Sequence, residues 1–288
     1  MDNSQTTLQD LRGEIDAIDS ELHALIKRRA ALVEQIRAVK ARDAITTVRP
    51  GREAHIMRTL ASRHDSNFPF AAVARIWREI IANITRMEMP EYAVAVFNAG
   101  ESENFWDLAR DQFGSATPMS GFASAREVLS EVSEGRAAIG VLPCPGEGDD
   151  DPWWANLAVR DGLRVCYRLP FTPPNGANSG GNGAEALAIG RIAADATDDD
   201  RSLIVVETRE TVSRTGLGQM MERVGLTGQP LASCQAGAWF YLVEADGFMT
   251  DDDARIEELA RLEGVDRAIL VGCYATPIEP SQIAARPS

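Results

Sequence analysis

The chain has 288 residues, of which 44% are hydrophobic, so it is long enough for two or three domains with real cores. It contains no apolar run of about 18 residues and its N-terminus is polar and acidic, which argues against a membrane-spanning helix and a signal peptide. The net charge of −14 argues against a nucleic-acid partner. The four cysteines form no CxxC pair, so the sequence predicts neither a disulfide framework nor a zinc site and favours the cytoplasm.

Charge is distributed unevenly between residues 1–90, here called the head, and residues 91–288, the body. The head holds 14 Lys and Arg against 12 Asp and Glu, a balance of +2, whereas the body holds 15 against 31, a balance of −16. This pattern favours the head as the place of any site for an anion.

Three helices are predicted in the head, over about residues 8–42, 50–64 and 69–89. Thr7 and Asp10 have capping-box spacing at the start of the first helix, and Pro50 suits the first turn of the second. The first helix is about 50 Å long at about 1.5 Å per residue, so two short helices cannot cover it and we expect the same helix of a second chain to pack against it. Apolar residues at three- and four-residue steps form its packing stripe: Leu8, Leu11, Ile15, Ile18, Leu22, Leu25, Leu32, Ile36 and Val39.

Arg29 occupies the slot of this stripe between Leu25 and Leu32. A guanidinium keeps its charge and is costly to bury unpaired, so the position predicts either a bound anion or a fixed carboxylate partner. Lys40 lies about 16 Å further along the same face. Arg12 lies about 25 Å away, so it reaches the same ligand only from the partner chain of an antiparallel pair.

Structural roles remain open for these residues. Glu53 or Glu88 could neutralise Arg29 in a structural pair, and Arg52, like the other cations taken singly, could be a solvated surface charge. The convergence of several cations and a carboxyl group on one apolar stripe favours the binding of an anion.

The body is predicted to contain two units. Residues 91–192 are expected to form an α/β lobe and residues 201–280 a ferredoxin-like βαββαβ domain, joined by an acidic linker over 192–201. A flexible Gly-rich loop is expected over 173–183. In chain order the predicted elements are strand 92–97, helix 103–113, helix 124–134, strand 137–142, strand 163–169, strand 186–189, strand 203–207, helix 212–224, strand 231–234, strand 238–244, helix 251–262 and strand 268–272.

Residues 8–90 resemble the all-helical, type II chorismate mutase family through motifs that cover nearly the whole head. These are L-x-x-L-R-x-x-I-D-x-I-D over 8–19, R-R at 28–29, I-x-x-x-K over 36–40, R-P-x-R-E over 49–53 and W-R-E-I-I over 77–81. The resemblance implies an intertwined homodimer with two sites, each completed by an arginine of the partner. It implies the site residues Arg12 of the partner, Arg29, Lys40, Arg52, Glu53 and Glu88, with Ile84 where family members often have a small hydroxyl residue. Of these, Arg52 would support the others without touching the substrate.

The implied reaction is the rearrangement of chorismate, a dicarboxylate, to prephenate in the synthesis of phenylalanine and tyrosine. It is intramolecular and pericyclic, and it needs no nucleophile, metal or cofactor, only a held conformer and charge stabilisation. Arg29 and the partner's Arg12 are expected to clamp the two carboxylates. Lys40 and a protonated Glu88 would face the ether oxygen, and Glu53 would accept a hydrogen bond from the ring hydroxyl.

Residues 91–275 resemble a prephenate dehydratase followed by its ACT regulatory domain. The likeness rests on N-A-G-E-S over 98–102, VLSEVSEGRAAIGVLP over 128–143, LAIGR over 187–191 and the βαββαβ order. The body departs from dehydratases by A-E-A at 184–186 in place of T-R-F, by C-P-G at 144–146 in place of E-N-S, and by a short loop in place of a second lobe. Altered ACT motifs at 215–217 and 232–235 argue against phenylalanine as effector and leave another small molecule open.

Three hypotheses follow. The favoured one is a chorismate mutase whose dehydratase-like body serves regulation or assembly. The alternatives are a bifunctional chorismate mutase and prephenate dehydratase, and a binding or regulatory protein whose mutase has lost activity, for instance through Ile84.

Overall fold

The computed structural model describes residues 7–43, 47–100, 105–160, 162–173 and 184–283, with the side chains of residues 34 and 37–43 outside the description. The head consists of the helices α1 (Leu8–Asp43), α2 (Pro50–Arg63) and α3 (Phe70–Glu88). Each agrees with its predicted range to within a residue or so. The predicted cap is also present, because the backbone N–H of Thr7 donates to Asp10 and that of Asp10 donates to the Thr7 hydroxyl.

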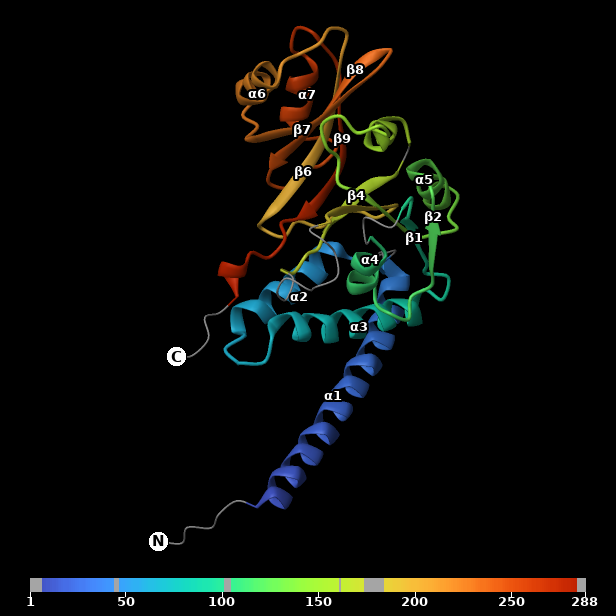
Figure 1. Cartoon of the computed structure of the whole chain (residues 1–288), viewed down its shortest axis with the longest axis vertical. Coiled ribbons are helices and arrows are strands. Elements are labelled where there is room, and N and C mark those ends of the chain that lie inside the picture. Colours follow the sequence, from blue (N-terminus) through green and yellow to red (C-terminus); the bar gives the residue numbers. More distant parts are fainter. Residues whose placement is uncertain (1–6, 44–46, 101–104, 161, 174–183, 284–288) are drawn as a thin grey trace.

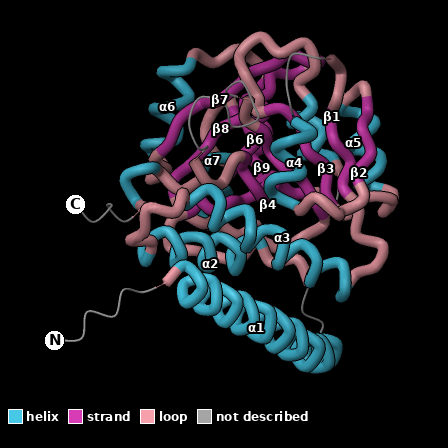
Figure 2. The backbone as a smooth tube through the Cα atoms, turned by 60° about the horizontal axis from the view of Figure 1, so that its bottom comes forward, coloured by secondary structure: helices cyan, strands magenta, loops and turns pink. Residues whose placement is uncertain are grey.

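Helix α1 projects away from the rest of the chain (Figure 1). Its apolar stripe is therefore uncovered: the exposed fraction of the described stripe residues ranges from 46% at Leu11 to 64% at Leu8. Helices α2 and α3 lie between α1 and one end of the sheet, as both overall views show (Figures 1 and 2). A row of apolar residues of this length needs a partner of comparable length to cover it.

The body contains a nine-stranded sheet with the order β2-β1-β3-β5-β4-β9-β6-β8-β7. Its first part pairs β1 in parallel with both β2 and β3, and continues through β5 and β4 by antiparallel pairs. The strands of this part are β1 (Val94–Phe97), β2 (Met119–Phe122), β3 (Ile139–Pro143), β4 (Arg164–Leu169) and β5 (Ala186–Gly190). Helices α4 (Phe105–Phe113) and α5 (Ala125–Ser133) pack on it, and α5 begins with the predicted capping box of Ser124 and Glu127.

The second part of the sheet has the predicted βαββαβ order. Its strands pair antiparallel as β9-β6-β8-β7. The elements are β6 (Asp200–Thr208), α6 (Arg214–Arg223), β7 (Gly228–Ala236), β8 (Ala238–Asp246), α7 (Ala254–Ala260) and β9 (Val265–Ala275). Short 3-10 helices, η1 (Trp153–Val159) and η2 (Pro280–Gln282), complete the described elements.

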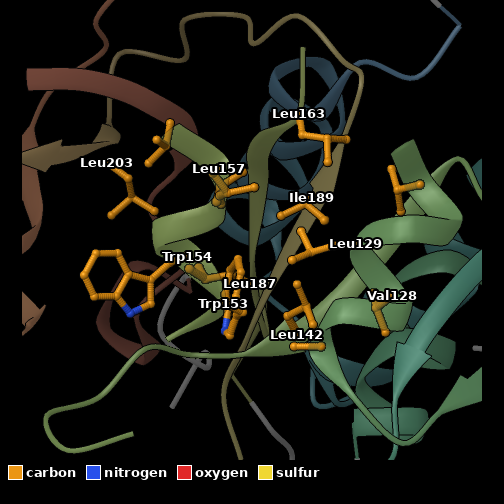
Figure 3. Packing of buried hydrophobic residues seen from close by; sticks show 14 of the residues in the cluster. Val128, Leu129, Leu142, Trp153, Trp154, Leu157, Leu163, Leu187, Ile189 and Leu203 are labelled. Carbon is orange, nitrogen blue, oxygen red and sulfur yellow. The ribbon is translucent and has the colours of Figure 1, made fainter. Parts of the chain in front are cut away.

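The two parts of the sheet join where β4 and β9 run parallel, with Val165 in register with Gly272. A Cβ atom at residue 272 would overlap the Val165 backbone, so only glycine permits this approach. The two parts also share a core, in which Trp153 and Trp154 of η1 lie near Leu203 of β6 and Leu187 of β5 (Figure 3).

The structure differs from the sequence-based expectations at several places, and some of the expected segments fall outside the described residues. Strand β2 and helix η1 were not predicted. The predicted acidic linker over 192–201 ends earlier, because β6 begins at Asp200, whose buried carboxylate accepts hydrogen bonds from the Thr197 backbone and hydroxyl at 2.7 and 2.6 Å. Residues 174–183 of the predicted loop and residues 103–104 of the predicted helix start lie outside the described residues.

The head is packed onto the body through an apolar cluster. Met57 of α2 and Phe70 and Ala74 of α3 form one core with Phe171 and Ile278 of the body. Among the described residues, no helix has both the length and the hydropathy needed to cross a bilayer.

Candidate functional site

Arg29 lies half-buried on α1 and one of its guanidinium nitrogens, Nη1, is buried without a hydrogen-bond partner among the described residues. Burial, and to a smaller extent the positive charge of Arg52, lower the pKa of the Arg29 guanidinium below its ordinary value. Arg52 is exposed in the first turn of α2. Arg29 thus combines a buried donor that lacks a partner among the described residues with the field of a second cation, and such a donor is suited to an anion.

The other predicted site residues of α1 lie on either side of Arg29. Arg12 is exposed near the N-terminal end of the helix. Lys40 lies within the helical backbone of α1, but its side chain falls outside the described residues. On α3, Ile84 is half-buried, and Glu88 is half-buried at the last position of the helix. The single chain therefore brings Arg29 and Arg52 together, and the roles predicted for Arg12, Lys40, Ile84 and Glu88 stay predictions.

Glu53 has two hydrogen-bond partners within the single chain, one on α3 and one on β4. Its carboxylate faces the body, where Oε2 accepts a hydrogen bond from Arg78 of α3 at 2.8 Å and Oε1 accepts one from the Tyr167 hydroxyl of β4 at 3.0 Å. The role of Glu53 as acceptor for a substrate hydroxyl, which the resemblance implies, stays a prediction. The alternative in which Glu53 neutralises Arg29 is not found, because its partner is Arg78.

Burial has the largest effect on the pKa of the Glu53 carboxyl. Burial raises the pKa of the Glu53 carboxyl, and the Arg78 charge and the Tyr167 hydroxyl offset this only in part. Burial likewise lowers the pKa of the Arg78 guanidinium against the opposing effect of Glu53. Burial also raises the pKa of Tyr167 well above its ordinary value, so this side chain stays a hydroxyl that can donate.

Arg78 and Tyr167 were missed by the sequence reasoning. A signal for Arg78 was present, because it stands one turn from Ala74 and from Ala82 on the buried face of α3, as Arg29 stands in the stripe of α1. Tyr167 carries no comparable signal, because tyrosine is common in buried strands.

In the body, the segments that differ from the dehydratase motifs are tied up in contacts with each other. The Cys144 backbone N–H donates to the Glu185 carbonyl, and the Glu185 carboxylate accepts from Arg168 at 2.7 Å. Arg168 also pairs with Glu244, 3.5 Å away. Burial raises the pKa of the Cys144 thiol to about 12, so it is no thiolate nucleophile at neutral pH. Within the described part of the chain, no group of three or more potential metal ligands occurs.

Comparison with known proteins agrees with the head as described. Residues 11–89 match the family model described as chorismate mutase type II, which confirms the resemblance predicted for residues 8–90. Over 145 residues the chain is 30% identical to the bifunctional chorismate mutase/prephenate dehydratase of Pseudomonas aeruginosa, in an alignment that covers 48% of this chain and 39% of the relative. The chain thus spans well under half of that protein's length.

Two solved structures are similar to the body. One is the quorum quenching acylase GqqA, at 16% identity and a TM-score of 0.46, over 67% of this chain and 98% of that one. The other is the prephenate dehydratase of Arthrobacter aurescens in complex with L-Phe, at 13% identity and a TM-score of 0.48, over 65% of this chain and 92% of that one. At these identities and TM-scores, neither structural similarity supports a conclusion about the activity of this chain.

Proposed function

We propose that this protein is a chorismate mutase that converts chorismate to prephenate at sites shared between two head regions of a homodimer. The observation that carries the proposal is the buried Nη1 of Arg29, which lacks a partner in the described part of the chain, feels the charge of Arg52 and belongs to a stripe that is exposed in the single chain. A second α1 helix would cover the stripe, and a dicarboxylate would satisfy the cations.

In this proposal Arg29 and the partner's Arg12 hold the two carboxylates of the compact substrate conformer. Lys40 and a protonated Glu88 stabilise the negative charge that develops on the ether oxygen as its bond to carbon breaks. Arg52 supplies positive potential beside Arg29. Ile84 supplies a wall without a hydrogen bond. No step requires a cofactor or a metal ion, because bond breaking and bond making occur within one molecule.

In this proposal the body has a non-catalytic role. We take residues 91–192 and 201–280 as its two units and the second as an ACT-like regulatory domain that binds a small effector other than phenylalanine. The bifunctional alternative finds less support, because A-E-A at 184–186 and C-P-G at 144–146 are engaged in the Arg168 and Glu185 contacts described above. The non-catalytic alternative finds support only in Ile84.

The test uses the purified full chain with chorismate and, separately, with prephenate. We expect chorismate to be consumed, no phenylpyruvate above the acid-catalysed background, and a fall in kcat/KM of about 100-fold or more in Arg29→Ala. Arg28→Ala is the matched control, because this exposed neighbour on the same helix should change kcat/KM little. A wild-type chain without chorismate turnover, or equal effects of the two variants, would contradict the proposal.

A further inference from the structure

The residues on both sides of Arg52, in the first turn of α2, contact the body. On the C-terminal side, Glu53 is bonded to Arg78 and to Tyr167 of β4, as described above. On the N-terminal side, Gly51 lies so close to the segment before β6 that a Cβ atom would stand 2.7 Å from both the Cβ and the carbonyl oxygen of Asp195. Arg52 itself is exposed, and its positive charge acts on the Arg29 guanidinium.

Further contacts continue this attachment along α2. Arg49 pairs with Asp195 at 3.0 Å, just before the helix begins. About two turns after the start of α2, Arg58 donates to the carbonyl oxygens of Thr197, Asp199 and Thr276 at 3.2, 2.7 and 2.8 Å. The start of α2 is thus fixed by groups of the body, and the backbone on either side of Arg52 has little freedom to shift by itself.

The buried ion pair at this contact contributes little net stability, because removing both charges from water costs free energy that their attraction offsets only in part. The Arg78 and Glu53 side chains are only 6% and 13% exposed, and apolar residues of similar size at such a place are often as stable or more stable. An ion pair with a second hydrogen bond to the carboxylate does, however, define the relative position of the groups that it joins. The Tyr167 ring is held in turn by Phe113 of α4, edge to face with the ring centres 5.4 Å apart.

We infer that Tyr167 is a positioning residue for the head. Through Glu53 it fixes the first turn of α2 and so places the Arg52 guanidinium beside Arg29, which makes the body part of the anion site without touching the ligand. This inference rests on the proposed mutase function. Because β4 is the strand at which the two parts of the sheet join, the same contact connects the head to the whole body.

The test compares Tyr167→Phe with Tyr274→Phe in the full chain. Tyr274 is the matched control, because it is also a buried tyrosine of the sheet whose hydroxyl donates to a carboxylate, but that carboxylate belongs to Glu244 of β8 and not to a residue of α2. We expect kcat/KM for chorismate to fall about tenfold in Tyr167→Phe, less than the roughly 100-fold cost of a 1 Å misplacement, and to change less than twofold in Tyr274→Phe. Equal effects of the two variants would overturn the inference.

A double-mutant cycle separates positioning from general damage. If Tyr167 acts through Arg52, then Tyr167→Phe should have no further effect on kcat/KM in an Arg52→Ala background. Full additivity of the two effects would overturn the inference.

A second measurement does not depend on activity. Amide hydrogen exchange of the first turn of α2 should be faster in Tyr167→Phe than in wild type and unchanged in Tyr274→Phe. If Tyr167→Phe is recovered unfolded, Phe113→Leu, which removes the ring that packs against Tyr167, should raise exchange in the same turn. Unchanged exchange would overturn the inference even in an active enzyme, whereas faster exchange in a chain that leaves chorismate intact would contradict only the proposed function.

Discussion

Replacing Arg78 with leucine removes the cation from the buried pair with Glu53 and should destabilise the protein strongly. The two side chains are 6% and 13% exposed, and the bonded nitrogen and oxygen are 2.8 Å apart. Removal of one partner from such a pair costs about 3–5 kcal/mol. We expect the lower end, about 3 kcal/mol, because the Tyr167 hydroxyl still donates to the carboxylate that is left behind.

The loss should grow with pH, because Glu53 is the group left without its cation. Burial already raises the pKa of Glu53 in the wild-type protein, and Arg78 is the largest of the opposing effects. For a carboxyl whose folded pKa is raised, the contribution to stability is complete below the unfolded value of 4.5 and is lost as pH rises through the folded pKa. Without Arg78 the folded pKa rises further, so the variant should be closer to wild type at about pH 5 than at about pH 8.

Thermal unfolding followed by circular dichroism at both pH values measures this effect. A loss of about 3 kcal/mol corresponds to a fall in Tm of about 6–12 °C for a chain of this size. Arg75→Leu is the matched control, because this arginine of the same helix pairs with Asp111 of the body, but with side chains 59% and 40% exposed, where a pair is worth about 0–1 kcal/mol. Equal shifts for the two variants, or a loss for Arg78→Leu that does not depend on pH, would refute the reasoning.

Three further predictions concern single positions. Gly272→Ala should lower Tm markedly, because the new Cβ overlaps the Val165 backbone. Gly218→Ala in α6 is the control, because its Cβ would meet open space and should leave Tm nearly unchanged. Equal Tm values for the two variants would show that β4 and β9 are not joined as described. The Cys144 thiol is half-buried and has a pKa of about 12, so it should react slowly with a thiol-specific disulfide reagent at about pH 8 and rapidly after unfolding. Fast labelling of this residue in the folded chain, located by mass spectrometry, would contradict the raised pKa. Glu88→Gln should keep or raise the mutase rate at neutral pH, because the amide donates without a proton being taken up, and a variant inactive at every pH would remove Glu88 from the ether-oxygen role.

Local patterns in the sequence predicted the head well. The stripe of α1 and the capping pair Thr7 and Asp10 depend only on residues a few positions apart, and the structure has both. The place of Arg29 in the stripe predicted either a bound anion or a fixed carboxylate partner, and its buried nitrogen Nη1 has no hydrogen-bond partner among the described residues. Strand β2 was missed because it is a four-residue edge strand of partly exposed residues, with no alternating pattern.

What the sequence did not predict depends on contacts between distant residues. Glu53, Arg78 and Tyr167 come from three elements, and nothing near any of them indicates which pairs with which. The continuous sheet was missed for the same reason: the joint at Val165 and Gly272 involves backbone groups at the edges of two units that each look complete. Hydrophobic periodicity identifies the buried face of an element, but not its neighbour.

The central claim, a mutase site shared between two chains, is tested most directly by mixing two inactive variants. Arg12→Ala and Arg29→Ala should each be nearly inactive alone. After unfolding and joint refolding of equal amounts, half of the dimers should be mixed and each should contain one site with both arginines, so activity should recover to about a quarter of the wild-type value. A mixture that stays inactive although mixed dimers are demonstrated by mass would contradict the shared site.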